Sequence, residues 1–388
     1  MLNKKVKVLF RHRSMEMGGV EKVLLSMLQN LDKDKFEITL LLNLFQGELR
    51  GEIPSHIRLE YLTKGKEDFS KNTIIQKFQL LWRRKKLNRF LKNPKLIDET
   101  VLKEKYDIEV AMTYADFDSV LNSSNKNSKK IGWFHSNIHT KGLKPLLPKI
   151  TQQLQQFDEL IFCGKNIETI LLQEFPHLDF PEIHVVTNPI PIDEILQKSE
   201  EFTPEKSDCP TFLGVGRLYH IKGFDKLISA HAQLISEGFL HKVVILGDGE
   251  DREKLLKQIK KLGVENTFRL LGNRQNPYPY IKNCDFFVLT SQAEAYPLSV
   301  AEALILKKPI IATNVGGVSE MITHLQNGYL IDFSTREIYL AMREFLTNPK
   351  LVSELQKNLK DSEKAFDNQK IFDKVEKILL NLSLKAAI

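Results

Sequence analysis

The sequence predicts an α/β protein with two Rossmann-like domains, each built on a parallel sheet that helices cover on both faces. Three observations support this fold class. Apolar runs of strand length alternate with amphipathic segments of helix length. The alternation occurs twice, once in each half, and 388 residues exceed what one hydrophobic core usually organises. We therefore expect two domains of similar size that face each other across a cleft.

The first half contains runs that predict strands at residues 6–10, 36–42, 108–112, 131–135, 159–163 and 184–188. In the second half, strands are predicted for TFLGVG, KVVILG, TFRLLG, DFFVLTS, PIIAT and NGYLI. Between the halves, NPIPIDEILQKSEEFTPEKSDCP contains four prolines and no sustained strand pattern, as is typical of a linker. The predicted organisation is an N-terminal domain at 1–190, a linker at 191–210, a C-terminal domain at 211–365, and a closing helix at 366–388 that packs back toward the N-terminal domain.

Composition is that of an ordinary globular protein, with 42% hydrophobic and 27% charged residues. No stretch approaches the roughly 18 to 20 apolar residues that a membrane span requires. The short apolar run before Arg11 is too small for the hydrophobic region of a signal peptide. The cysteines, Cys163, Cys209 and Cys284, lie far apart without metal-binding or disulfide spacing. We expect a cytoplasmic chain with reduced thiols.

The net charge of +7 is unevenly distributed, because residues 77–105 contain ten Lys or Arg and three acidic residues. One face of a predicted helix in this region is apolar, with Leu80, Leu87 and Leu91 at its centre and Trp82 and Phe90 at its edge. Such a basic amphipathic helix, at residues 77–95, suits contact with anionic lipid headgroups. It equally suits a solvated helix whose stripe packs on its own domain, and the sequence leaves both interpretations open. Nucleic-acid binding is not expected, because the run lacks interleaved aromatic residues on a recognisable binding fold.

A first candidate site lies in the loop RLYHIKG, which follows the predicted strand TFLGVG and carries Arg217 and Lys222. Ligands of open α/β sheets bind outside the carboxyl ends of the strands. Two cations and the amide groups at the start of a helix are able to neutralise a diphosphate there. The alternative is a surface loop with two ordinary cations.

A second candidate site follows the strand DFFVLTS, where Glu294 precedes a helix that Pro297 is suited to begin. Glu302 lies about one and a half turns into that helix. A carboxylate on the loop can accept hydrogen bonds from sugar hydroxyls, and one on the helix can accept the paired hydroxyls of a ribose. The amides of residues 295–298 face the same crevice. Alternatively, Glu302 is a helix-surface acid and Glu294 is a capping group.

These motifs together resemble a known family. VGRLYHIKGFDKLISA, LGDGEDREKL and SQAEAYPLSVAEALILKKPIIATNVGGVSEMI have the order and spacing seen in the retaining GT-B glycosyltransferases of family 4, the glycosyl transferases group 1. GGVEKVLLSML stands in the position of that family's N-terminal glycine loop. The resemblance covers about residues 1–30 and 105–365. It implies a GT-B fold, with an acceptor-binding N-terminal domain and a nucleotide-sugar-binding C-terminal domain.

The resemblance also implies roles for individual residues. Arg217 and Lys222 would bind the donor diphosphate. The first glutamate of the family's E-x7-E motif, here Glu294, would contact the donor sugar, and the second, Glu302, would hold the ribose. His135 would reach the donor sugar across the cleft, so the predicted catalytic residues are His135, Arg217, Lys222 and Glu294. The other predicted donor-site positions are Gly18, Gly19, Gly216, Gly272, Asn273, Ala295, Tyr296, Pro297 and Leu298. Backbone at Gly272 and Asn273 would meet the nucleobase.

Two departures from the family pattern bear on the sugar. Ala295 and Tyr296 stand where Gly and Phe are frequent, which makes the sugar-facing loop bulkier. The triplet HSN at 135–137 replaces a frequent His-Asp pair, which changes the polar network expected around His135. Without the family, His135 would be interpreted as a strand-end histidine hydrogen-bonded to backbone.

Asp116 and Asp118 have the DxD spacing that binds a metal ion in other glycosyltransferases. With two cations available to offset the diphosphate charge, a metal is not required, and the family works without one. We therefore expect no metal and no cofactor besides the nucleotide sugar, and the two aspartates fit the acceptor side better.

The expected function is retaining transfer of a hexose or N-acetylhexosamine from a UDP-sugar, in preference to a GDP-sugar. The acceptor would be a saccharide or lipid-linked saccharide in surface polysaccharide, lipopolysaccharide or other glycan assembly. A leaving phosphate oxygen would accept the acceptor's proton, and a double displacement through Glu294 ranks second. Alternative functions are a catalytically silent GT-B module that binds nucleotide or glycan, and a GT-B phosphorylase or epimerase. The expected location is cytoplasmic, at the inner face of the plasma membrane if the basic helix binds lipid.

Overall fold

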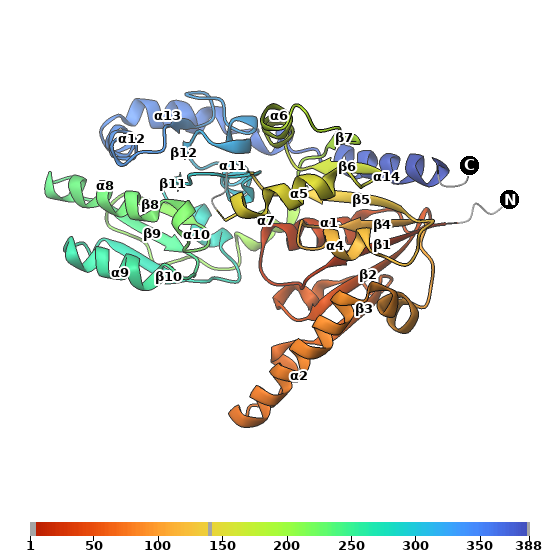
Figure 1. Ribbon diagram of the computed structural model, residues 1–388. Coiled ribbons are helices and arrows are strands. Elements are labelled where there is room, and N and C mark those ends of the chain that lie inside the picture. Colours follow the sequence, from red (N-terminus) through yellow and green to blue (C-terminus); the bar gives the residue numbers. More distant parts are fainter. Residues whose placement is uncertain (1–4, 139–141, 386–388) are drawn as a thin grey trace. The chain divides into compact units, whose positions relative to one another are not determined.

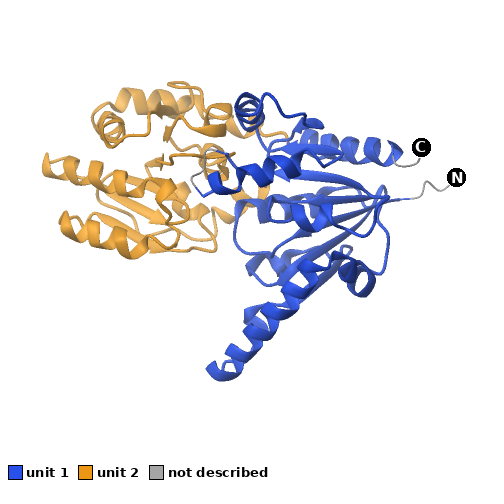
Figure 2. Cartoon of the chain, viewed as in Figure 1, with its two compact units in different colours: residues 1–189, 368–388 blue, residues 190–367 orange. Residues whose placement is uncertain are grey.

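The computed structural model describes residues 5–138 and 142–385. The chain divides into two compact units (Figure 2). Unit 1 comprises Met1–Pro189 together with Asn368–Ile388, and unit 2 comprises Ile190–Asp367. Among the helices that the structure describes, none combines the length and the apolar character that crossing a bilayer would need.

Unit 1 contains a seven-stranded sheet in the order β3-β2-β1-β4-β5-β6-β7, and all neighbouring strands are parallel. Its strands are β1 (Val6–His12), β2 (Phe36–Phe45), β3 (Arg58–Lys64), β4 (Ile108–Ala111), β5 (Lys129–Phe134), β6 (Glu159–Phe162) and β7 (Glu182–Val185). Its α-helices are α1 (Gly19–Asn30), α2 (Thr73–Lys92), α3 (Pro94–Ile97), α4 (Phe117–Leu121), α5 (Leu147–Leu154), α6 (Lys165–Glu174) and α14 (Asn368–Lys385). The strand order reverses between β1 and β4, which makes their carboxyl ends the topological switch point of this sheet.

The core of unit 1 joins the two ends of the chain. Val8 of β1 and Leu24 of α1 are fully buried in one apolar cluster with Val375 and Leu379 of α14. In Figure 1 the helix α14 lies along the same sheet as the N-terminal strands. Burial of its apolar face therefore makes α14 a structural part of unit 1.

Unit 2 contains a six-stranded parallel sheet in the order β10-β9-β8-β11-β12-β13. Its strands are β8 (Thr211–Val215), β9 (Lys242–Leu246), β10 (Phe268–Gly272), β11 (Phe286–Leu289), β12 (Ile310–Thr313) and β13 (Tyr329–Ile331). Its α-helices are α7 (Ile192–Lys198), α8 (Phe224–Ser236), α9 (Arg252–Lys261), α10 (Tyr278–Asn283), α11 (Leu298–Ile305), α12 (Thr335–Thr347) and α13 (Pro349–Asn358). Here the switch point lies between β8 and β11.

The predicted fold class is confirmed, since both units are α/β with parallel sheets. The strand and linker assignments were each wrong in one detail. β3 was not predicted, because this edge strand is mostly half-exposed and has no apolar run. The segment 191–210, predicted as a linker, contains α7, whose Ile195 is fully buried in the core of unit 2.

The basic helix α2 begins at Thr73 and ends at Lys92, so it is shorter at its C-terminus than the predicted 77–95 and longer at its N-terminus. The side chain of Asn72 caps it by accepting hydrogen bonds from the amides of Ile74 and Ile75. The predicted apolar face was partly wrong, because Phe90 is buried whereas Trp82 is 74% exposed. In Figure 1, α2 (orange) extends away from the sheet of unit 1.

Candidate active site

The carboxyl edge of the unit 2 sheet is built from two loops that meet at the switch point. The loop after β8 carries Arg217 and Lys222, and the loop after β11 carries Glu294. Hydrogen bonds to backbone join these loops: Thr290 Oγ1 donates to the Lys222 carbonyl at 2.9 Å, and the Gln292 amide donates to the Ile221 carbonyl at 2.7 Å. The loops therefore hold each other in place where ligands of this fold class bind.

Glycines allow these loops to approach closely. Gly223 has a φ of 65°, and a Cβ there would lie 2.1 Å from the Thr290 carbonyl oxygen. At Gly317, whose amide donates to the Ala295 carbonyl at 3.0 Å, a Cβ would lie 2.3 Å from that same oxygen. Both positions exclude any larger residue without movement of backbone.

The structure brings Lys222 and Glu294 together. The ammonium Nζ of Lys222 lies 2.7 Å from Oε1 of Glu294, and both side chains are partly buried. The hydroxyl of Ser291 donates to the same carboxylate oxygen. A cation is thus fixed beside a carboxylate at the strand ends, an arrangement that offers positive charge to a phosphate and an acceptor to a hydroxyl.

Arg217 is exposed and forms no ion pair within the part of the chain that the structure describes. Its backbone is nevertheless anchored, because the amide of Leu218 donates to the Asp248 carbonyl and the Leu218 carbonyl accepts from the Asp251 amide, each at 3.0 Å. A guanidinium held on a fixed loop without an acidic partner is suited to an anionic ligand.

Glu302 is buried, with 5% of its surface exposed, so the alternative of a helix-surface acid is wrong. It lies on α11, which begins after Pro297, and its Oε1 is 3.5 Å from the hydroxyl of Tyr278. The N-cap residue of this helix is Pro297, whose side chain forms no capping hydrogen bond. Glu302 therefore lies on the element that follows Glu294, at the same edge of the sheet.

The predicted positions Gly216, Gly272 and Asn273 also lie at the carboxyl ends of strands in unit 2. Gly272 ends β10 with a φ of 75°, and its carbonyl accepts a 2.9 Å hydrogen bond from the Gly247 amide. A Cβ at Gly272 would meet nothing within 4 Å, and Asn273 is exposed. Gly216 immediately follows β8 and lies beside the Lys222 side chain. The edge at Gly272 and Asn273 is thus open.

A second polar cluster lies at the switch point of unit 1 and was not predicted. Its centre is His12, the last residue of β1, which is buried. Nε2 of His12 lies 3.2 Å from Oε1 of Glu21, and Nδ1 lies 3.4 Å from Oδ2 of Asp116. Burial lowers the pKa of His12, but the hydrogen bonds and charges of the two acids outweigh it and raise the pKa to about 9. His12 is therefore an imidazolium at neutral pH.

The N-terminal glycine loop adjoins this cluster. Gly18 is the N-cap of α1, and Gly19 is its first residue. A Cβ at Gly18 would lie 2.2 Å from Oε2 of Glu21, so the glycine leaves room for the carboxylate that pairs with His12. Only the position of a histidine at the end of the first strand, beside a switch point, signalled this cluster in the sequence.

His135 follows β5 and stacks on Trp133 with ring centroids 5.5 Å apart. Both ring nitrogens are buried and have no hydrogen-bond partner among the described residues, so the alternative of a histidine bonded to backbone is wrong. Burial, and to a smaller extent the charge of His12, lower the pKa of His135 to about 3. His135 is thus neutral at physiological pH, with two unsatisfied nitrogens available to a ligand.

The two aspartates with DxD spacing have different partners. Asp116 is buried, accepts a 2.8 Å hydrogen bond from the Thr113 hydroxyl, and contacts His12. Asp118 is exposed and pairs with Lys149 and Gln153 of α5. Because each carboxylate is engaged separately, this pair does not form the shared ligand set that a DxD metal site needs.

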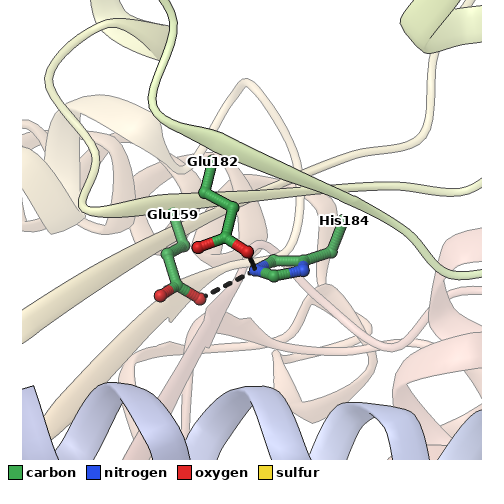
Figure 3. Close-up of side chains that lie close together, drawn as sticks. All are labelled: Glu159, Glu182 and His184. Carbon is green, nitrogen blue, oxygen red and sulfur yellow. Dashed lines mark hydrogen bonds and ion pairs between the residues drawn. The ribbon is translucent and has the colours of Figure 1, made fainter.

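One group of described residues has the composition of a metal site, namely Glu159, Glu182 and His184, shown in Figure 3. Nε2 of His184 lies 2.9 Å from Glu159 and 3.8 Å from Glu182. The ammonium of Lys385 already lies 2.7 Å from Glu159. Both glutamates begin their strands, so the group lies at the amino edge of the sheet, away from the ligand-binding edge. We interpret it as a contact that holds α14 on the sheet.

The fold and these strand-end loops define a GT-B type α/β protein. Residues 197–362 match the family model described as glycosyl transferases group 1. This match and the named glycosyltransferase relatives identify the chain as a glycosyltransferase, as the sequence resemblance predicted.

Relatives with known names support this family. The chain is 27% identical over 372 residues to the N-acetylgalactosamine-N,N'-diacetylbacillosaminyl-diphospho-undecaprenol 4-alpha-N-acetylgalactosaminyltransferase of Campylobacter jejuni, covering 95% of this chain and 97% of that one. It is 26% identical to the poly(ribitol-phosphate) alpha-N-acetylglucosaminyltransferase of Staphylococcus aureus, over 60% of this chain and 47% of that one. Among solved structures, HepE of Anabaena in complex with UDP-glucose is similar with a TM-score of 0.74 at 19% identity, covering 97% of this chain and 99% of that one.

Proposed function

We propose that this glycosyltransferase moves a hexose or N-acetylhexosamine from a nucleoside diphosphate sugar to a saccharide acceptor, with retention at the anomeric carbon. The observation that carries the proposal is the Lys222–Glu294 pair at the switch point of unit 2. Arg217 lies on the same loop as Lys222, is exposed and has no ion-pair partner among the described residues. Transfer from a nucleotide sugar needs cations that stabilise the departing diphosphate. A carboxylate near these cations is suited to bind the sugar hydroxyls.

The predicted side chains and the predicted nucleobase edge keep their roles in this proposal. Arg217 and Lys222 bind the diphosphate and offset the negative charge that grows as the sugar leaves. Glu294 accepts hydrogen bonds from hydroxyls of the donor sugar, and the buried Glu302 holds the ribose. His135 binds the donor sugar through its unsatisfied ring nitrogens. The open edge at Gly272 and Asn273 receives the nucleobase, and the amides of residues 295–298 line the sugar-facing loop.

The proposed chemistry needs no base from the chain. The bond from the anomeric carbon to the diphosphate breaks through an oxocarbenium-like transition state, and a leaving phosphate oxygen accepts the proton of the acceptor hydroxyl. A double displacement would use Glu294 as nucleophile. Because Oε1 of Glu294 already accepts from Lys222 and Ser291, its nucleophilicity is lowered, and this route ranks second.

The donor is proposed to be a UDP-sugar. Structures of the similar HepE contain UDP and UDP-glucose, which supports uridine over guanosine. The name of the Campylobacter enzyme gives a diphospho-undecaprenol acceptor, which supports a lipid-linked saccharide and hence a place in surface glycan assembly. Such an acceptor lies at a membrane, so we also propose a cytoplasmic protein at the inner face of the plasma membrane.

The test measures nucleotide release from a panel of UDP- and GDP-sugars, with and without saccharide acceptors. Arg217→Ala and Glu294→Ala are expected to lower turnover about 100- to 1000-fold. Matched controls are Arg336→Ala and Glu265→Ala, which remove exposed side chains of the same types elsewhere in unit 2. Turnover at the control level in both site variants would overturn the site assignment, and consumption of free phosphate without nucleotide release would indicate a phosphorylase instead.

A further inference from the structure

The helix α2 presents a row of large apolar side chains to solvent. Besides Leu91 near its C-terminus, α2 exposes large apolar side chains between Thr73 and Trp82, namely Ile74, Ile75, Phe78, Leu81 and Trp82. At 3.6 residues per turn, they occupy an arc of about 120° on one side of the helix. Phe78 is 68% exposed and Trp82 is 74% exposed, although such residues are normally buried. We call these five residues the α2 stripe.

The α2 stripe is not the face by which the helix packs on its own unit. On the other side of α2, Phe90 is buried and Leu87 packs against the same cluster, which includes Leu62 of β3. Arg83 donates to Oε1 of Gln46 at 3.1 Å, also on that side. The helix thus has one packed face and one uncovered apolar face, and a helix that served only to cover its own unit would need only the first.

The charge of α2 is of one sign. Between Thr73 and Lys92 there are seven Lys or Arg residues and no Asp or Glu. None of the seven forms an ion pair with an acid within the described ranges 5–138 and 142–385. By helical angle, Lys85, Arg89 and Lys92 continue the line of the α2 stripe toward the C-terminus of the helix. An apolar segment is therefore followed by a cationic segment along one side.

We propose that α2 docks on the surface of an anionic lipid bilayer, with the α2 stripe between the headgroups and the cations on lipid phosphates. This deepens the proposed function and rests on it for its purpose, which is to bring the enzyme to a lipid-linked acceptor. Aromatic and aliphatic side chains gain free energy at the headgroup boundary, and neighbouring Lys and Arg attract anionic lipid. A second copy of this chain is a poor partner for the α2 stripe, because two such helices would bring fourteen Lys and Arg side chains together and these would repel one another.

The chain contains its own reporter for this contact. It has two tryptophans, the exposed Trp82 in the α2 stripe and the buried Trp133 in β5. Any change of emission on adding vesicles to the folded protein therefore reports Trp82. With vesicles of phosphatidylcholine and phosphatidylglycerol, we expect a blue shift and protection from acrylamide quenching. With pure phosphatidylcholine we expect a much smaller change, and added salt should weaken binding to the anionic vesicles.

Two pairs of variants separate the apolar and the charged contributions. The double variant Ile74→Ser/Phe78→Ser keeps Trp82, and we expect it to reduce co-sedimentation with anionic vesicles at least about tenfold. Arg84→Gln/Lys85→Gln should reduce it about 30-fold. The matched controls are Leu240→Ser, which removes an exposed leucine of unit 2, and Lys257→Gln/Lys261→Gln on α9, and both should bind as wild type.

Equal binding of wild type to neutral and anionic vesicles, or variants that bind as well as their controls, would overturn the proposal. So would self-association that the α2 stripe variants abolish, because it would assign the stripe to a second copy. Nucleotide release measured in solution without vesicles keeps the two proposals apart. Variants that lose vesicle binding should retain this turnover, and a protein that binds vesicles but shows no turnover would contradict the proposed function alone.

Discussion

The paired charges around His12 predict an unusual dependence of stability on pH. The pKa of His12 is raised from 6.5 to about 9, against the effect of burial, because Asp116 and Glu21 stabilise the imidazolium. A histidine whose pKa is higher in the folded than in the unfolded state stabilises the fold fully below pH 6.5. This contribution is lost as pH rises through about 9. The perturbation that tests this is His12→Gln.

The magnitude follows from the shift itself. Each tenfold change in the proton equilibrium is worth about 1.4 kcal/mol, so raising the pKa from 6.5 to about 9 corresponds to about 3 kcal/mol. Unit 1 of the wild type should lose about this much free energy of unfolding between the two pH values. In His12→Gln, the same interval should show a much flatter profile. Asp116→Asn removes one of the two acids and should give an intermediate slope.

Tryptophan fluorescence is the assay, since Trp82 and Trp133 both lie in unit 1 and unit 2 has none. Denaturant unfolding followed by this signal reports unit 1 alone, and it is measured at a series of pH values for each protein. His56→Gln, which removes an exposed histidine of the same unit, is the control. Parallel profiles for wild type and His12→Gln across this interval would refute the reasoning, because Asp116 and Glu21 would then not stabilise the imidazolium.

Three further predictions address packing and the site. Gly223→Ala should lower the unfolding free energy of unit 2 by more than about 1 kcal/mol in a thermal unfolding experiment, because the added Cβ would meet the Thr290 carbonyl. Gly238→Ala is the control and should cost less, because Gly238 also has a positive φ, of 89°, but has open space around it. His135→Phe keeps a ring against Trp133 and removes the unsatisfied buried nitrogens, so the variant should retain its stability. Its turnover should fall at least about tenfold. Unchanged turnover would show that the nitrogens bind no substrate. Ile195→Ala should destabilise unit 2 by about 2 to 5 kcal/mol in calorimetry, as expected of a buried residue and not of a linker.

The sequence predicted the sheets and the donor loops well because both depend on local patterns. In a parallel sheet that is covered on both faces, each strand is a nearly continuous run of apolar residues. Most strands could therefore be predicted from the sequence. Lys222 and Glu294 are 72 residues apart, yet each follows a strand, and β8 and β11 are neighbours. Knowing the fold was therefore sufficient to expect these residues at the same edge.

What the sequence could not predict depends on contacts between distant segments. His12 belongs to no motif, and its partner Asp116 comes from a loop about a hundred residues further along the chain. The packed face of α2 was misjudged because apolar residues occur around the whole helix, and only the tertiary structure decides which of them, such as Phe90, are covered. The burial of Glu302 likewise depends on its surroundings, which include Tyr278 of α10.

The membership of α14 in unit 1 has a consequence for how the protein is made. Phe372, Val375 and Leu379 fill the same core as the first strand, so that core stays open until the last helix has been synthesised. Unit 2, in contrast, is one continuous segment from Ile190 to Asp367 and can complete its own core earlier. During translation, the half that is synthesised first is therefore the last to finish folding, and removing α14 damages the beginning of the chain more than the middle.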